Sequence, residues 1–281
     1  LAKLKISCSP DILDRVCELC PKLCQIDFST DSLIEGEHKF FDKVVSLSLY
    51  HTVDCGILKR FVNLTKFDER YHKFEPIGDI SELPSLVTLS VTNWSGLDTS
   101  RLANLSELTI NFSDNPEILN KINSPHLKVL TCSFAAEKDK SFFVSVSIPN
   151  LEYLTLRFGE PTPKKLVLFG MQKLVSFNLA MRDSSVFNFD KTFLSGVPNL
   201  REFRFDFDAF LGDPVLDPEI FLATPNLEKL VTASDLRFAG LKKLCFASQT
   251  LGKFFVFFIL VNEAISCSSK NIRHNPLSDF C

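Results

Sequence analysis

Apolar and polar residues follow a recurring pattern along most of the chain. An apolar residue is followed three residues later by a second and two residues after that by a third, as in Leu86, Leu89 and Val91. The pattern opens eleven times, at residues 1, 23, 44, 64, 86, 105, 127, 151, 174, 200 and 227, in steps of 19 to 27 residues. The opening at residue 64 fits weakly, through Leu64 and Phe67 alone. Self-similarity at a period of about 20 to 29 residues is typical of a repeat solenoid.

Each motif predicts one short strand. Side chains alternate between the two faces of a strand, so positions four and six of each repeat should point into a shared core. Positions three, five and seven should then face solvent on the concave side of a single parallel sheet. Because no repeat can bury its apolar face alone, the stack has to supply the core. The pattern predicts that Leu89, Leu108, Leu130 and Leu154 lie side by side on adjoining parallel strands.

The segments between the strands carry turn and helix signals. Proline, one residue and leucine occur together six times, beginning at residues 21, 84, 125, 149, 198 and 225. Three segments also combine a capping residue, a proline and an acid, which predicts helices that begin at Pro10, Pro116 and Pro218. Each helix should end near the next Pro-x-Leu, because proline disfavours helix at the residue before it.

Phenylalanine is unusually common, with 28 residues against a single tryptophan. Position eight of five successive repeats is Phe112, Phe134, Phe158, Met181 and Phe207. Strand alternation carries that position inward, which predicts a stacked aromatic spine inside the solenoid. A solvent-facing aromatic row that binds a ligand is the alternative interpretation.

Charge and composition narrow the classes of partner. The net charge is −3 and no basic stripe occurs, which argues against nucleic acid or an anionic membrane as the partner. The longest apolar run, residues 254–261, is far shorter than the roughly 20 residues of a membrane-spanning helix. Nine cysteines, an odd number without regular pairing, indicate reduced thiols and therefore a cytoplasmic or nuclear location. Four N-x-S/T triplets, at Asn63, Asn93, Asn104 and Asn111, support an extracellular alternative.

Two clusters of side chains in the sequence are candidates for metal binding or catalysis. Cys17, Cys20 and Cys24 have a spacing close to that of a metal site, with Cys8 as the nearest fourth ligand. Their place on an apolar helix stripe of Ile12, Leu13, Val16, Cys17, Leu19 and Cys20 favours core packing instead.

A thiol nucleophile is suggested by the proximity of His51, Asp54 and Cys55. Nothing nearby supplies an oxyanion hole or an orienting group for such a nucleophile. We therefore expect no catalytic residue, no metal and no cofactor.

The predicted concave face carries the candidate binding residues. Its middle holds short polar side chains such as Thr109 and Thr131. Larger side chains form two groups, which we predict to contact a protein partner: Lys66, Asp68 and Arg70, and Tyr153, Arg157, Glu202, Arg204 and Asp206. Tyr and Arg often carry the binding energy of an interface. The alternative is that these charges only pair across neighbouring strands, each pair contributing less than about 1 kcal/mol.

These features resemble the leucine-rich-repeat proteins over residues 1–250, and "LDRVCELCPKLCQIDFS" and "IPNLEYLTLRF" resemble the irregular repeats of fungal-type F-box proteins. The resemblance implies an α/β horseshoe with a parallel sheet on its concave face and short helices and loops outside. It also implies the substrate-recognition region of a cullin-type ubiquitin ligase, whose F-box would bind a Skp-type adaptor. No F-box is present in the chain, which opens directly in a strand motif, so we expect sequence upstream of Leu1.

Two other functions remain open from the sequence. One is an interaction scaffold without an F-box, in a nuclear or kinetochore assembly, and the other is an extracellular recognition protein. At the other end, residues 251–265 are predicted to form a terminal strand or cap and residues 266–281 a disordered tail.

Overall fold

The computed structural model describes residues 3–50, 55–70, 80, 83, 85–92, 98–113, 116–135, 143–159, 163–182, 192–207, 215–216, 218–232 and 237–238. The predicted terminal strand at 251–265 and the tail at 266–281 lie outside these residues, as do His51 and Asp54.

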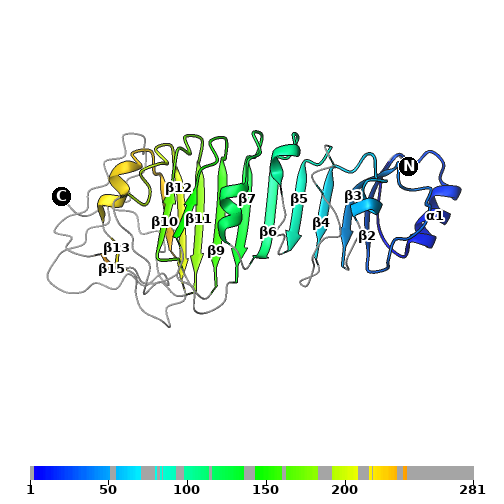
Figure 1. The fold of residues 1–281 in the computed structure, drawn as a ribbon, viewed down its shortest axis with the longest axis horizontal. Coiled ribbons are helices and arrows are strands. Elements are labelled where there is room, and N and C mark those ends of the chain that lie inside the picture. The colour runs from blue at the N-terminus through cyan, green and yellow to red at the C-terminus, as the bar shows by residue number, and fades with distance from the viewer. Residues whose placement is uncertain are drawn as a thin grey trace, which may run out of the picture.

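One long parallel sheet dominates the molecule (Figure 1). Its eleven strands follow one another in chain order and pair in parallel. They are β1 (Lys3–Ser7), β2 (Gln25–Thr30), β3 (Val44–Leu49), β4 (Lys66–Glu69), β5 (Thr88–Thr92), β6 (Glu107–Ser113), β7 (Val129–Phe134), β9 (Tyr153–Phe158), β11 (Ser176–Met181), β12 (Glu202–Phe207) and β14 (Lys229–Thr232). A strand therefore follows each of the eleven openings, in a solenoid-like α/β arrangement.

The leucines at position four form the predicted row. Leu89 pairs in register with Leu108, Leu108 with Leu130 and Leu130 with Leu154. Each of these side chains is at most 1% exposed. The prediction of adjoining parallel strands with a shared core is confirmed, and burial alternates along β7, β9 and β11 as period two requires.

The register between β2 and β3 differs from the predicted repeat alignment. Phe28, expected at position six, pairs with Leu47 at position four, and Thr30 pairs with Leu49. The first two strands are thus displaced by two residues relative to the other nine. A displacement of two residues keeps every side chain on its face, so the inward pattern of the sequence does not reveal it.

The Pro-x-Leu segments are tight turns that lead into the strands. Leu151 donates its backbone N–H to Ile148 at 3.1 Å and Leu200 donates to Val197 at 3.1 Å. Each turn has a proline at its second residue, where a φ near −65° is required. The same contact occurs at Leu23, Leu127 and Leu227. The same turn forms without proline at Leu64, Leu105 and Leu174, so proline favours this turn but is not required for it.

The residue between proline and leucine also links neighbouring repeats. Asn150 donates its side-chain amide to the Pro125 carbonyl at 2.8 Å, and Asn199 donates to the Gln172 carbonyl at 2.7 Å. Asn226 makes the equivalent bond to Pro198 at 3.2 Å. These asparagines satisfy turn carbonyls that the sheet does not reach. The repeated Pro-Asn-Leu was a signal for this contact that our sequence analysis did not use.

The return segments cover the apolar face of the sheet with little regular structure. The helices are α1 (Pro10–Leu19), α2 (Cys55–Leu58) and the 3₁₀ segments η2 (Thr99–Arg101), η3 (Pro116–Lys121) and η5 (Pro218–Ala223). The predicted starts at Pro10, Pro116 and Pro218 are confirmed, although the last two open 3₁₀ turns instead of α-helices. Two small parallel sheets were not predicted and pair β10 (Lys165–Leu168) with β8 (Phe143–Val146) and β13 (Val215–Leu216) with β15 (Arg237–Phe238).

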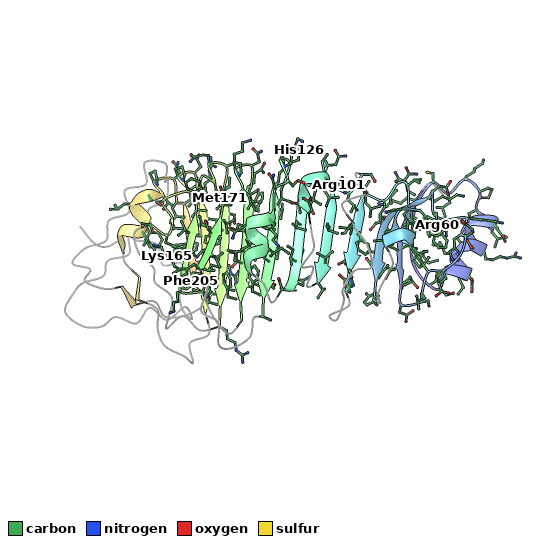
Figure 2. All side chains as sticks on the ribbon, viewed as in Figure 1. Arg60, Arg101, His126, Lys165, Met171 and Phe205 are labelled. Carbon is green, nitrogen blue, oxygen red and sulfur yellow. The ribbon has the colours of Figure 1, made fainter. Side chains whose placement is uncertain are left out.

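Phenylalanine fills much of the core. Phe134 and Phe158 stack with ring centroids 5.1 Å apart, and Met181 continues the buried position-eight row. A bulge in β6 places Ser113, and not Phe112, in register with Phe134, so the backbone register of the row departs here from the predicted spacing. Phe177 and Phe203, at position four, form a second stack 5.4 Å apart. Phe205 and Met171, labelled in Figure 2, are fully buried. The aromatic residues thus form several core clusters, of which the position-eight row is one.

Of Cys17, Cys20 and Cys24, which were predicted to pack in the core, only Cys17 does so. Cys17 is 4% exposed and packs into the core one turn after Leu13. Cys20 and Cys24 are exposed, as are Ile12 and Leu19 on the same helix. The buried stripe of α1 is narrower than predicted, because the helix packs on the sheet through Leu13 and Cys17 while its last turn points away.

Candidate functional site

The solvent-exposed face of the main sheet, here called the open face, carries positions three, five and seven of the repeats. One register row along it consists largely of hydroxyl side chains: Ser7, Ser29, Ser48, Asp68, Ser90, Thr109, Thr131 and Thr155. Asn178 and Arg204 continue the row on β11 and β12. Short hydroxyls leave the sheet surface accessible to another molecule, and each can both donate and accept a hydrogen bond.

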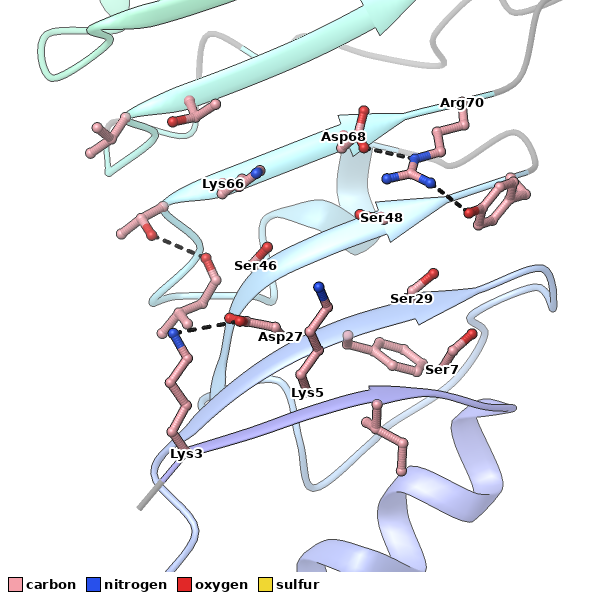
Figure 3. A pocket seen from close by; sticks show the side chains of 17 residues that line it. Lys3, Lys5, Ser7, Asp27, Ser29, Ser46, Ser48, Lys66, Asp68 and Arg70 are labelled. Atoms are coloured by element: carbon pink, nitrogen blue, oxygen red, sulfur yellow. Dashed lines mark hydrogen bonds and ion pairs between the residues drawn. The ribbon is translucent and has the colours of Figure 1, made fainter. Parts of the chain in front are cut away.

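A groove of about 850 Å³ hollows the open face over β1 to β5 (Figure 3). It contains the first predicted group, with Lys66 and Asp68 on β4 and Arg70 directly after it. Arg70 donates from Nε to Asp68 Oδ2 at 2.8 Å and from Nη1 to the Tyr50 hydroxyl at 2.7 Å. Its guanidinium carbon also lies 5.3 Å from the centre of the Tyr50 ring. Arg70 therefore holds Tyr50 in place at the rim.

The second predicted group lies on β9 and β12, and β5, β6 and β7 separate it from the first. Arg204 Nε bonds Asp206 Oδ2 at 2.7 Å, and Glu202 accepts from Lys229 Nζ at 2.6 Å. Tyr153 is 49% exposed on β9, and Arg157 stands at the other end of that strand. A shallower hollow of about 660 Å³ is lined by Arg157, Asp206 and Met181. The eight predicted residues thus form two patches on one face.

The pairing geometry differs from the expected cross-strand pairing. Arg70 with Asp68 and Arg204 with Asp206 are pairs two residues apart on one strand. Of the eight predicted residues, Glu202 alone forms an ion pair with a neighbouring strand within the described part of the chain, and its partner is Lys229. Side chains two apart on a strand point to the same face, which allows this contact. Within the described residues, Lys66, Tyr153 and Arg157 make no such pair, and Lys66 and Tyr153 are exposed.

Several residues of the N-terminal groove were missed. Lys3, Lys5 and Ser7 on β1 and Asp27 on β2 line it together with β4. The alternation in "LAKLKIS" already assigned Lys3 and Lys5 to the outward face, so the signal was present. What the sequence did not reveal was the displacement between β2 and β3, which brings Lys5 into the register row of Lys66.

Glu69 is an unexpected residue in the core. It occupies position six of its repeat, where other strands carry Leu49 or Val91, and its side chain is 1% exposed. Its Oε2 accepts the Thr92 backbone N–H at 2.9 Å, while Oε1 has no hydrogen-bond partner among the described residues. Burial raises the pKa of this carboxyl to about 7, and the Thr92 bond only partly opposes that shift.

Two observations on the described residues concern metal binding and thiol chemistry. They contain no group of three or more His, Cys, Asp or Glu side chains that could hold a metal ion. Burial raises the pKa of the Cys17 and Cys132 thiols, which disfavours their nucleophilic thiolate forms. No helix in the described part of the chain is both long and apolar enough to cross a membrane.

Comparison with known proteins assigns no family to this arrangement. No family model matches the sequence, and no curated protein matches it. The open face and its two polar patches are therefore the features of the molecule that bear on its function.

Proposed function

We propose that the chain is a leucine-rich-repeat solenoid whose concave surface, the open face, binds a protein partner. The observation that carries the proposal is that the two faces of the main sheet differ: one is buried and apolar, and the other is exposed and polar. The apolar side chains form a continuous core, while the open face carries a row of hydroxyl side chains flanked by Tyr and Arg side chains. Such a surface offers hydrogen bonds and aromatic anchors over many strands.

A photo-cross-linking experiment tests the proposal. Benzoylphenylalanine placed at Tyr153 on the open face should give discrete protein adducts in cells. The same group at Lys121, an exposed position at the end of η3, serves as the control and should give none of these adducts. Replacing Arg157 by Glu should deplete the Tyr153 adducts, because the charge reversal lies on the same strand. Adducts from Lys121 alone, or adducts insensitive to Arg157→Glu, would contradict a binding role for this face.

We further propose that the solenoid is the substrate-recognition region of an F-box-type ubiquitin ligase receptor. Support comes from the Cys-Pro-x-Leu sequence at residues 20–23, which forms the turn between α1 and β2. The expected result is that a Skp-type adaptor co-purifies with the full-length gene product. A full-length product without that adaptor would favour the scaffold interpretation, and it would leave the open-face proposal intact.

A further inference from the structure

The N-terminal groove has a charge opposite to that of the whole chain. Four basic side chains and two acidic ones line it, a net charge of +2, whereas the protein carries −3. A concave site of one sign concentrates ligands of the other sign. The groove therefore favours an anionic occupant.

Lys5 and Lys66 are the source of this excess charge. Lys3 lies 3.5 Å from Asp27 and Arg70 lies 2.8 Å from Asp68, so these four charges compensate one another. Figure 3 shows dashed lines for both pairs and none at Lys5 or Lys66. Among the described residues neither lysine pairs with a carboxylate, and both are exposed. They form two anion-binding points on the surface of the groove.

The spacing of the two lysines is set by the sheet. Lys5 pairs in register with Asp27, Asp27 with Ser46 and Ser46 with Lys66, so three strand spacings separate them. At about 4.8 Å per spacing, their Cα atoms lie roughly 14 Å apart. An extended chain advances about 3.3 Å per residue, and its side chains four residues apart share a face about 13 Å apart. The two distances match.

The floor between the two lysines suits a peptide backbone. Asp27, whose charge is paired with Lys3, and Ser46 lie between the two lysines in this register row, and Ser29 and Ser48 are half-buried in the next row. The hydroxyls of the three serines can donate to or accept from peptide groups. Tyr50, 44% exposed and held by Arg70, offers an aromatic surface at the rim. The groove thus combines charge, hydrogen bonding and one aromatic contact.

We infer that the N-terminal groove binds an extended acidic segment of a partner protein, with two carboxylates four residues apart on Lys5 and Lys66. The segment runs across the strands, along the direction in which the repeats stack. This inference rests on the proposed protein-binding role of the open face and specifies the chemistry of one partner segment.

The test uses the whole chain with its lysines converted to ¹³C-dimethyl-lysine, which keeps their charge. The probe is a Gly/Ser peptide that carries two Asp residues four positions apart. The Lys5 and Lys66 signals, assigned from single variants, should shift and saturate with one common Kd. Lys5→Gln and Lys66→Gln should each weaken binding about fivefold, and the double variant about twentyfold. In these variants the signal of Lys3, which also lines the groove, reports binding.

Control variants and peptides distinguish recognition of two carboxylates at this spacing from non-specific electrostatic attraction. Lys22→Gln and Lys121→Gln remove exposed charges outside the groove and should leave the Kd unchanged. A peptide with its Asp residues two positions apart should bind about fivefold more weakly, and one with Asn in their place should not bind. Equal affinity for both spacings, or a phosphoserine peptide that binds more tightly than the two-Asp peptide, would overturn the inference.

The two proposals fail in different ways. If the acidic peptide does not bind while Arg157→Glu still removes the Tyr153 adducts, the acidic-segment inference is wrong and the open face remains a binding surface. If the peptide binds as described but the Tyr153 adducts are insensitive to Arg157→Glu, the proposed function of the open face is wrong for the whole protein.

Discussion

Between pH 4.5 and about pH 8, the free energy of unfolding of the wild-type protein is expected to fall by about 3 kcal/mol relative to that of the Glu69→Gln variant. The cause is the buried Glu69 carboxyl, whose pKa is about 7 in the folded protein against 4.5 for an ordinary glutamate. The folded state therefore binds more protons than the unfolded state in this window. Stability is highest at the acidic end and is lost as the pH rises through 7.

The glutamine variant isolates this effect. Its side-chain carbonyl can still accept the Thr92 N–H, but it does not ionise. Urea unfolding at several pH values should show the steeper pH dependence only in the wild type. Glu107→Gln, which removes an exposed carboxyl from β6 of the same sheet, is the matched control and should follow the wild-type curve. Parallel curves for wild type and Glu69→Gln would show that Glu69 does not titrate differently on folding.

The second large effect is expected for Gly196→Ala, which should destabilise the protein by about 3 kcal/mol. A Cβ at this position would lie 2.7 Å from the carbonyl carbon of Leu168 and closer still to its oxygen. The obstacle is the backbone at the end of β10, so no side chain can rotate away. One segment has to shift, and with it the hydrogen bond of 3.0 Å from Met171 N–H to the Gly196 carbonyl.

Urea unfolding and hydrogen exchange at the Met171 amide measure this effect. Gly36→Ala serves as the control, since Gly36 has a φ of 79° and nothing within 4 Å of an added Cβ. It should cost only about 1 kcal/mol, from backbone conformation alone. A Gly196→Ala protein with wild-type exchange at Met171 would mean that the repeats are less closely packed here than the structure indicates.

The candidate site was only partly accessible from the sequence. Alternation along the strands correctly assigned Lys66, Tyr153 and Arg204 to the exposed face. The groove over β1 to β5 was not predicted, because its shape depends on side-chain packing and on the displacement between β2 and β3, which the spacing of the repeats does not specify. The same holds for the pairing of Arg70 with Asp68, which depends on side-chain conformations that spacing does not specify.

The sequence by itself determined where the strands of the main sheet lie and which face most of their residues occupy. The reasons are local: a tight turn, with proline in six of the repeats, leads into each strand of the main sheet, and period two then predicts the face of each side chain. The tertiary structure alone decided the two-residue displacement at β2, the bulge in β6 that admits Ser113, and the burial of Glu69 in a leucine position. Each of these depends on how a strand meets its neighbours. A register displacement of two residues, or a single polar residue in the core, leaves the apolar pattern of the sequence intact. Such features are therefore seen only in how a strand packs against the adjoining repeats.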